Sequence, residues 1–233
     1  MTKVTFKSLQ VVYPGDTFQP VANARFGDGI KKINNKPTIT RSGMLKYQEN
    51  TKYYYVYSDL KKYHPSIGDV VIGKIAKRTK EKYLVDIGSY LYGELDQLAF
   101  ENATKKSKPQ LEEGDYVYCR VVEMNENVAI LMCLSQRKME DGFGELKEGW
   151  TFQLPQNMCR KLMSTNCTIL DCIGEYTPYE IAVGINGLVW VRSLNAVKDV
   201  AIESCIVSCI GVVDTNIPGT IKLCWSKWKQ YMN

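Results

Sequence analysis

The chain has a single histidine, His64, among its 233 residues. A metal site built from several imidazole ligands is therefore excluded, and a Ser-His-Asp or Cys-His catalytic arrangement would depend entirely on this one side chain. His64 precedes Pro65, a dipeptide typical of extended or turn segments. We expect His64 to be a residue at a domain junction rather than a catalytic base.

Clustered carboxylates are also scarce. Hydrolysis of a phosphodiester by two metal ions needs several carboxylates that hold the ions about 4 Å apart, and the carboxylates considered for such a site are Glu94 and Asp96. Two carboxylates at the end of one strand do not make such a site. The chain also has no Walker-type phosphate loop, so the sequence predicts no enzyme, no bound metal and no cofactor.

The eight cysteines lack the spacing of metal ligands. Cys167 with Cys172, and Cys205 with Cys209, are the closest pairs, and neither forms a CxxC motif. Most of the cysteines lie among apolar residues, as small buried side chains do in a reducing compartment. We expect free thiols in the protein core.

Long apolar runs are absent as well. The longest, Ala201 to Val213, is interrupted by polar residues such as Glu203 and Ser208, so it cannot form a membrane span. Hydrophobic residues make up 45% of the chain and charged residues 24%, which is typical of a globular protein. The net charge of +5 permits an anionic partner without requiring one. The sequence predicts a folded protein with no membrane partner.

The segment from Tyr63 to Gly93 combines two strand patterns with a line of cations. Val70 to Ala76 and Tyr83 to Ile87 are typical of strands, and Lys77 to Lys82 would form a charged hairpin tip between them. Gly73 interrupts the first strand and indicates a bend or a close backbone approach. Cations beside tyrosine rings are the combination that binds single-stranded nucleic acid.

We therefore predict an RNA-binding surface on this hairpin and on a basic loop that follows it. The predicted phosphate contacts are Lys74, Lys77, Arg78, Lys80, Lys82, Lys105, Lys106 and Lys108. Tyr83 and Tyr92 are the predicted stacking rings. Strand alternation places Tyr83 on one face with Val85 and Ile87, so a position in the core is an alternative for Tyr83. A solvated lysine-rich loop is the alternative for residues 105–108.

The order of patterns divides the chain into three predicted domains. Residues 1–63 contain turn formers and short β runs, which predict a small β domain. Residues 64–147 contain five short strands that fit an OB barrel; these are Val70–Ala76, Tyr83–Ile87, Leu91–Leu95, Tyr116–Glu123 and Val128–Leu134. Residues 148–233 predict an α+β domain, with a helix over Pro155–Ser164 and a strand over Thr168–Ile173.

The motif Gly-Ile-Asn-Gly at residues 184–187 matches the GxxG pattern of KH domains, whose loop clamps a nucleic-acid backbone. Runs of β-prone residues stand on both sides of it, which predicts a hairpin turn rather than a clamp between two helices. Neither the motif nor Leu188 after it supplies a basic residue. We interpret Gly184, Asn186 and Gly187 as a structural turn, in which Asn186 takes a positive-φ or hydrogen-bonded position.

Taken together, these motifs resemble one protein family. The similar segments are VVYPGD at residues 11–16, YHPSIGDVVIGKI at 63–75, ATKKSKP followed by GDYVY within 103–118, and VGINGLVWV at 183–191. They resemble the RNA-exosome cap subunits called ribosomal RNA-processing protein 40, or exosome component 3. The resemblance covers nearly the whole chain. It implies a mainly β fold with α+β parts: an N-terminal β domain, an S1-type OB-fold barrel and a C-terminal KH domain in which GxNG replaces the usual clamp.

The resemblance also implies a non-catalytic, RNA-binding role. Members of this family are expected to sit with other cap subunits on a ring of RNase PH-like proteins, at the entrance for RNA. There they guide single-stranded RNA, with little sequence preference, into 3′-to-5′ processing and degradation, including rRNA maturation. The implied location is the nucleus and nucleolus, and also the cytoplasm. Leu188 departs from the family pattern, in which a basic residue often follows GxNG.

Three alternatives remain open at this point. The related KH-bearing cap subunit, ribosomal RNA-processing protein 4, shares the architecture, although the ATKKSKP segment favours the first assignment. A stand-alone OB-fold protein would bind RNA, for instance on ribosomes, without exosome subunits. A metal-dependent ribonuclease would use Glu94 and Asp96 and would cleave RNA in the presence of magnesium.

Overall fold

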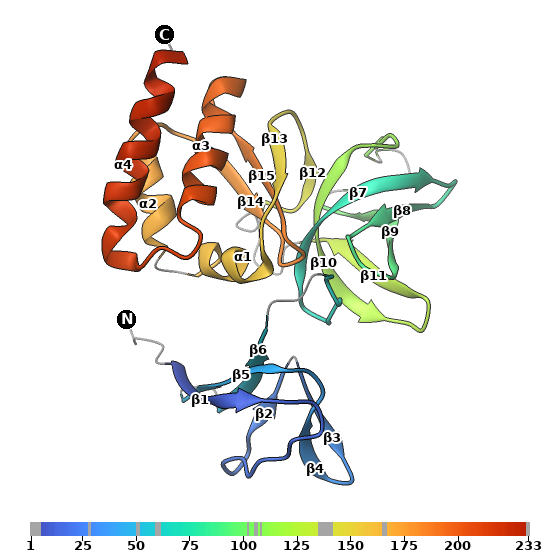
Figure 1. The fold of residues 1–233 in the computed structure, drawn as a ribbon. Coiled ribbons are helices and arrows are strands. Elements are labelled where there is room, and N and C mark those ends of the chain that lie inside the picture. The colour runs from blue at the N-terminus through green and yellow to red at the C-terminus, as the bar shows by residue number, and fades with distance from the viewer. Residues whose placement is uncertain are drawn as a thin grey trace. The chain divides into compact units, whose positions relative to one another are not determined.

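A computed structural model describes residues 6–27, 29–49, 52–58, 62–101, 103–104, 107, 109–134, 142–164 and 167–231. The chain forms two compact units, Met1–Leu60 and Lys61–Asn233 (Figure 1). The second unit contains both the predicted barrel and the predicted KH domain, which share a small apolar cluster around Ile72 and Trp190. Among the described residues, no helix has the length and apolar character needed to cross a membrane.

The first unit is a small β domain. Its four-stranded sheet has the order β1-β5-β6-β2. The strands of the unit are β1 (Phe6–Val12), β2 (Arg25–Phe26), β3 (Ile30–Ile33), β4 (Lys36–Ile39), β5 (Gly43–Gln48) and β6 (Tyr53–Tyr57), of which β3 and β4 form a separate hairpin. Side chains alternate along β6, so that Tyr54 and Val56 are buried with Leu45 whereas Tyr57 is exposed on the other face. This alternation gives the unit its own core.

The second unit begins with a closed barrel of OB type. Its strands are β7 (Val70–Arg78), β8 (Lys82–Asp86), β9 (Tyr92–Phe100), β10 (Tyr116–Met124) and β11 (Val128–Cys133). They follow the order β11-β9-β8-β7-β10, and the pairing of β10 with β11 closes the barrel. A short strand, β12 (Gly144–Leu146), extends the sheet beside β10. The five predicted strands are confirmed, with β9 longer than expected.

Two residues near the start of the barrel, Tyr63 and Gly73, pack closely against it. A Cβ at Gly73 would overlap the Val85 side chain on β8, so the predicted close approach at this glycine is confirmed. Tyr63 is buried in the barrel core, and its hydroxyl donates a hydrogen bond to Oδ2 of Asp69 at 2.7 Å. Tyr63 therefore packs with the barrel, although the sequence assigned it to the end of the N-terminal domain.

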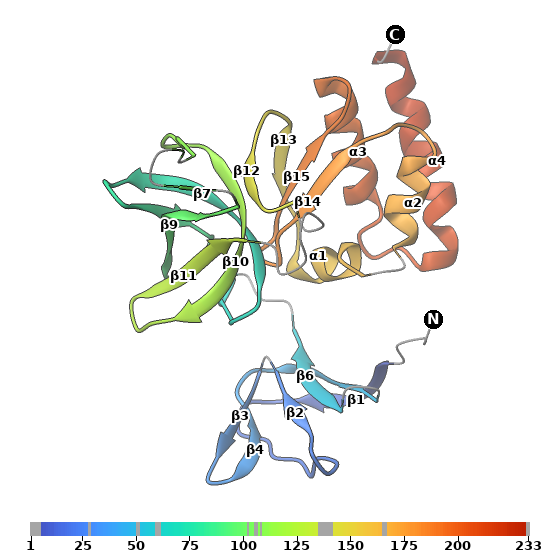
Figure 2. The same cartoon turned by 180° about the vertical axis from the view of Figure 1, so that it is seen from behind.

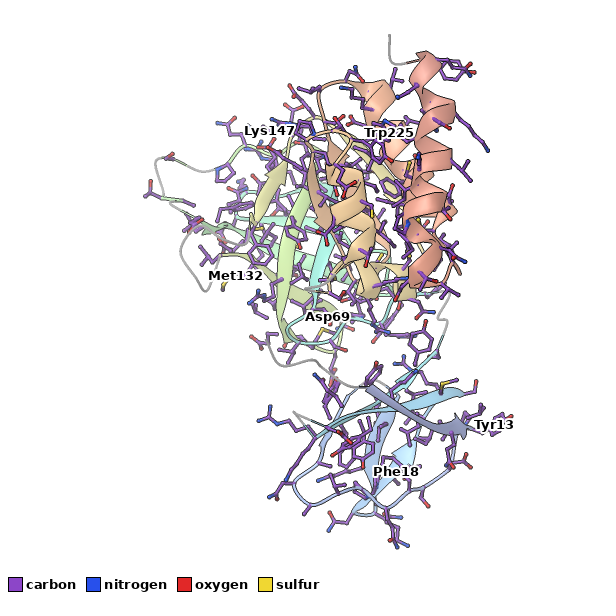
Figure 3. All side chains as sticks on the ribbon, turned by 90° about the vertical axis from the view of Figure 1, so that its left-hand side faces the viewer. Tyr13, Phe18, Asp69, Met132, Lys147 and Trp225 are labelled. Carbon is purple, nitrogen blue, oxygen red and sulfur yellow. The ribbon has the colours of Figure 1, made fainter. Side chains whose placement is uncertain are left out.

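The remainder of the second unit has the element order β-α-α-β-β-α-α. Its elements are β13 (Trp150–Gln153), α1 (Gln156–Leu162), α2 (Thr168–Gly174), β14 (Glu180–Val183), β15 (Leu188–Arg192), α3 (Ala196–Ser208) and α4 (Ile217–Trp228), with 3₁₀ turns η1 (Asp214–Asn216) and η2 (Lys229–Tyr231). The sheet order is β13-β15-β14. Helices α2, α3 and α4 lie on the side of this sheet away from the barrel (Figures 1 and 2). Trp225 on α4 is buried among these helices (Figure 3). Its ring is tilted by 30° against the Tyr176 ring, with 5.3 Å between the ring centroids.

Helix α2 corrects one sequence-based prediction. Thr168–Ile173 was expected to be a strand because it is rich in β-branched residues. Ile169 and Ile173 are four residues apart and both are fully buried in the core between helices and sheet. A strand would place Asp171 on the same face as both, yet Asp171 is exposed; a helix brings positions i and i+4 together and turns position i+2 away. Tertiary packing therefore decides the structure of this segment over its local propensity.

Candidate nucleic-acid interface

The β7–β8 hairpin carries most of the predicted phosphate contacts at its tip. The Thr79 hydroxyl donates to the Lys82 carbonyl at 2.7 Å, and the Lys82 amide donates back to Thr79 Oγ1 at 3.1 Å. These bonds close the turn and hold the tip in one conformation. Lys77, Arg78 and Lys80 are exposed there. The tip therefore presents three accessible cations from a constrained backbone, which suits contacts to a phosphate chain.

Lys82 is less available than the sequence suggested. Its Nζ lies 2.8 Å from Oε2 of Glu94 on the neighbouring strand β9. The hydrogen bond to Glu94, and then the charge of that carboxylate, raise the pKa of Lys82. Asp96 stands directly opposite Lys82 in the β8–β9 register. An ion pair this exposed exchanges readily with solvent, but part of the positive charge of Lys82 is already balanced.

Lys74 lies farther along β7, away from the tip. It is exposed, and its Nζ is 5.9 Å from the centroid of the Tyr116 ring on β10. Its register partner on β8 is Asp86. Lys74 thus extends the positive charge along β7 beside an aromatic ring, a pairing that contributes modestly at an exposed site.

Tyr83 corrects the predicted set of stacking rings. The side chain is fully buried, with its ring edge-on to Phe100 at 6.4 Å. Its hydroxyl donates to the Pro109 carbonyl at 2.6 Å and accepts from the Leu111 amide at 3.3 Å. No face of the ring is open to a base. The reason is the strand alternation that put Tyr83 on the core face with Val85 and Ile87.

The exposed rings lie at the other end of the strands. Tyr92 begins β9 and is 49% exposed, and it is separated from the hairpin tip by the length of β8, about 17 Å for five residues. Beyond it, His64 and Tyr90 bring their ring centroids to 5.7 Å. The cations of the tip and the exposed rings therefore do not form one cluster but lie at opposite ends of the hairpin.

From the sequence, His64 was predicted only to lie at a domain junction, and its contact with Tyr90 was not predicted. A bridge between the backbones of Tyr63 and Ser89 brings the two rings together. No local pattern reports a contact across this separation, so only the fold reveals it.

The outward face of β8 and β9 is acidic. Asp86 on β8, and Glu94 and Asp96 on β9, project from the strands between the tip and the exposed rings. Like charges repel the phosphates of an RNA chain, so this face is a poor path for RNA. Lys105, Lys106 and Lys108, the cations predicted for the basic loop, lie outside the described residues.

The GxNG turn does not face solvent but packs against the barrel. It joins β14 to β15, as predicted, and Gly187 has a φ of +95°. The buried Asn186 side chain donates from Nδ2 to the carbonyls of Ile72 at 2.7 Å and Ile87 at 3.0 Å. A Cβ at Gly184 would lie 2.7 Å from the Ile72 amide nitrogen. Asn186 is thus hydrogen-bonded, with partners in the barrel rather than in its own turn.

The position of a KH clamp, between the two helices, is occupied by a different sequence. Helix α1 ends at Leu162 and α2 begins at Thr168. The residues between them, Met-Ser-Thr-Asn-Cys at 163–167, contain no glycine. A glycine-free connection does not allow the close backbone approach by which GxxG grips a nucleic-acid chain. The KH part therefore supplies no clamp of the usual kind.

The carboxylates considered for catalysis are engaged or scattered. Glu94 pairs with Lys82, and Asp96 Oδ1 accepts a hydrogen bond from the Leu98 amide at 2.7 Å. Within the described part of the chain, no three His, Cys, Asp or Glu side chains gather closely enough to hold a metal ion.

Comparison with known proteins places this geometry in a family. Residues 63–144 match the family model described as "Exosome complex component RRP40, S1 domain", and residues 149–197 match a KH domain model. The exosome complex component rrp40 of Schizosaccharomyces pombe is 37% identical over 222 residues, covering 90% of this chain and 92% of the relative. The chain belongs to the exosome complex component RRP40 family.

Other relatives include both RRP40 and Rrp4 components. The RRP40 component of Saccharomyces cerevisiae is 31% identical over 216 residues, covering 88% of this chain and 90% of that protein. The Rrp4 component of Methanosphaera stadtmanae is 25% identical over 192 residues, covering 81% of this chain and 82% of that protein. A crystal structure described as a candidate exosome complex RNA-binding protein has a TM-score of 0.57 and 21% identity, covering 74% of this chain and all of that one, and supports the fold.

Proposed function

We propose that this chain is a non-catalytic, RNA-binding cap subunit of the RNA exosome, which guides single-stranded RNA into 3′-to-5′ processing and degradation, including rRNA maturation. The observation that carries the proposal is an S1 barrel of the RRP40 family whose hairpin tip exposes Lys77, Arg78 and Lys80. The relatives bear the name of exosome components. A cap subunit needs a surface for RNA and no reaction centre.

The chemistry of the tip supports sequence-tolerant binding. Lysine and arginine contacts to phosphates read no base, and aromatic stacking accepts every base. Lys77, Arg78 and Lys80 would supply the main phosphate contacts, and Lys74 a further one along β7. Lys82 would contribute less because Glu94 shares its charge. This tolerance suits an entrance that admits many RNAs.

The partners in this proposal are RNA, the RNase PH-like ring and the other cap subunits. The expected location is the nucleus and nucleolus, and also the cytoplasm. The S1 and KH parts form one compact unit locked by Asn186, which would present the barrel to RNA from a rigid support. The absence of a GxxG clamp between α1 and α2 favours the S1 barrel over the KH part as the RNA contact.

Affinity purification tests the assembly. The chain would be tagged at its own locus, purified from native cells, and its stoichiometric partners identified by mass spectrometry. We expect RNase PH-like ring subunits and two further cap subunits. Recovery of the chain alone, or of ribosomes without exosome subunits, would contradict the proposal and favour the stand-alone OB-fold alternative.

A cleavage assay tests the non-catalytic role. The purified chain would be incubated with end-labelled single-stranded RNA and Mg²⁺, beside a Glu94→Gln, Asp96→Asn double variant. We expect both proteins to leave the RNA intact. Cleavage by the wild-type chain that disappears in the double variant would support the ribonuclease alternative instead.

A further inference from the structure

Two aromatic rings stand exposed at the end of the barrel remote from the hairpin tip. Tyr90 is 66% exposed, and its ring lies 5.7 Å from the His64 ring with an interplanar angle of 52°. Neither ring belongs to the barrel core. Burial of a tyrosine ring would stabilise the fold, so a ring held in solvent adds nothing to the core and is available to a ligand.

The backbone under these rings is fixed on both sides. The Tyr63–Ser89 bridge ties the two segments together, and buried Tyr63 anchors the first through its hydrogen bond to Asp69. In the second segment, the Gly88 amide donates to Oδ1 of Asp86 at 2.9 Å. Rings on an ordered backbone lose little conformational entropy when a ligand stacks on them.

Charge indicates how RNA could reach the rings from the tip. The outward face of β8 and β9 is closed to phosphates by Asp86, Glu94 and Asp96. Along β7 the exposed charge is positive, because Lys74 lies between the tip and the His64–Tyr90 end. From Arg78 to Lys74 this strand is accessible over about 13 Å. Between Gly73 and Val70 it is covered by the KH part, because Ile72 is fully buried and Asn186 and Ile185 bond to its backbone.

We propose that His64 and Tyr90 form a base-stacking site for single-stranded RNA whose phosphates are held by the hairpin tip and by Lys74. The inference rests on the proposed RNA-binding function and adds a second contact at the opposite end of the barrel. The ligand is a nucleobase of any identity, because stacking requires only a π face. Tyr92, two residues beyond Tyr90, is also exposed.

Fluorescence anisotropy with a labelled twelve-nucleotide oligouridine tests the site on the full chain at several salt concentrations. Tyr90→Ala should weaken binding about 5- to 150-fold, the range for loss of one stacked base, with the salt slope unchanged because no phosphate contact is lost. Tyr90→Phe keeps the ring and should bind within about twofold of wild type. Tyr13→Ala is the matched control: Tyr13 is 63% exposed but lies in the N-terminal unit, and its removal should leave affinity unchanged.

The outcomes separate this site from the function on which it rests. Wild-type affinity in Tyr90→Ala, combined with weakened binding in Lys77→Ala, Arg78→Ala, would overturn the stacking site and leave the RNA-binding function standing. Unchanged RNA affinity together with loss of exosome subunits from purified Tyr90→Ala would identify the rings as a protein contact and also overturn the inference. A wild-type chain that does not bind RNA would overturn the proposed function and the site together.

Discussion

The Asn186 side chain bonds to both backbone groups of Ile72, as a neighbouring strand would. Its Nδ2 donates to the Ile72 carbonyl at 2.7 Å, and its Oδ1 accepts from the Ile72 amide at 3.3 Å. The Ile185 amide adds a backbone bond to the Val70 carbonyl at 2.9 Å. The GxNG turn therefore continues the hydrogen bonding of β7 and joins the KH sheet to the S1 barrel, which explains why its glycines and asparagine face protein rather than RNA.

Asn186→Ala should lower the free energy of unfolding by about 2 to 4 kcal/mol, because it leaves buried groups of Ile72 and the Ile87 carbonyl without a partner. Urea unfolding at neutral pH measures the loss. Asn195→Ala, which removes an exposed helix cap, is the comparison and should cost only about 1 kcal/mol. Full stability of Asn186→Ala with loss of RNA binding would mean that the turn contacts RNA after all.

Lys77→Ala, Arg78→Ala should weaken RNA binding and flatten its dependence on salt. Each phosphate contact on a single strand contributes about 0.7 to the slope of log K against log salt, so the double variant should reduce the slope by about 1.4. Lys222→Ala, Lys227→Ala removes the same charge from exposed positions on α4 and should leave the slope unchanged. An unchanged slope in the hairpin variant would remove the tip from the RNA path.

Tyr83→Phe should destabilise the barrel by about 1 to 3 kcal/mol without changing the RNA affinity of the folded protein. The substitution removes the hydroxyl that bonds the Pro109 carbonyl and the Leu111 amide, and it leaves the aromatic ring in the core. Thermal or urea unfolding measures the first effect and anisotropy the second. The opposite pattern, a stable variant with weakened RNA binding, would place the Tyr83 hydroxyl at the interface.

Alkaline pH should reduce stability through buried thiols. The eight cysteines are free, and burial raises the pKa of Cys159 to about 12. The Cys159 thiol therefore ionises near pH 8.5 in the unfolded chain and only near pH 12 in the folded chain. The stability that it contributes is present below pH 8.5 and is lost progressively as the pH rises to 12. Between pH 7.5 and 10, the free energy of unfolding measured in urea should fall by about 1 to 2 kcal/mol less in Cys159→Ala than in wild type. Equal falls in both proteins would contradict a raised pKa at Cys159.

Local patterns in the sequence were sufficient for the hairpin and the barrel strands. The Lys77–Lys82 tip follows from a charged turn between two β runs, and the glycine at position 73 marks the place where β7 approaches Val85. The hairpin form of GxNG was also predictable, because β-prone residues flank it on both sides. These features depend on neighbours within a few residues.

The features that sequence reasoning missed depend on distant partners. Asn186 and Ile72 are 114 positions apart, so the sequence could identify a structural turn but not what it binds. The His64–Tyr90 pair depends on a bridge between separate segments. Tyr83 satisfied two patterns at once, an aromatic ring among cations and a core position in a strand, and packing decided between them.

Crosslinking of RNA to the chain within its native complex tests the central claim most directly. Cells expressing the tagged chain would be irradiated, the complex purified, and nucleotide-linked peptides mapped by mass spectrometry. We predict crosslinks in the peptides that span Lys74 to Lys82, in a complex that contains RNase PH-like subunits. Crosslinks confined to the GxNG turn, or RNA bound to the chain without any exosome subunit, would contradict an S1-barrel cap subunit.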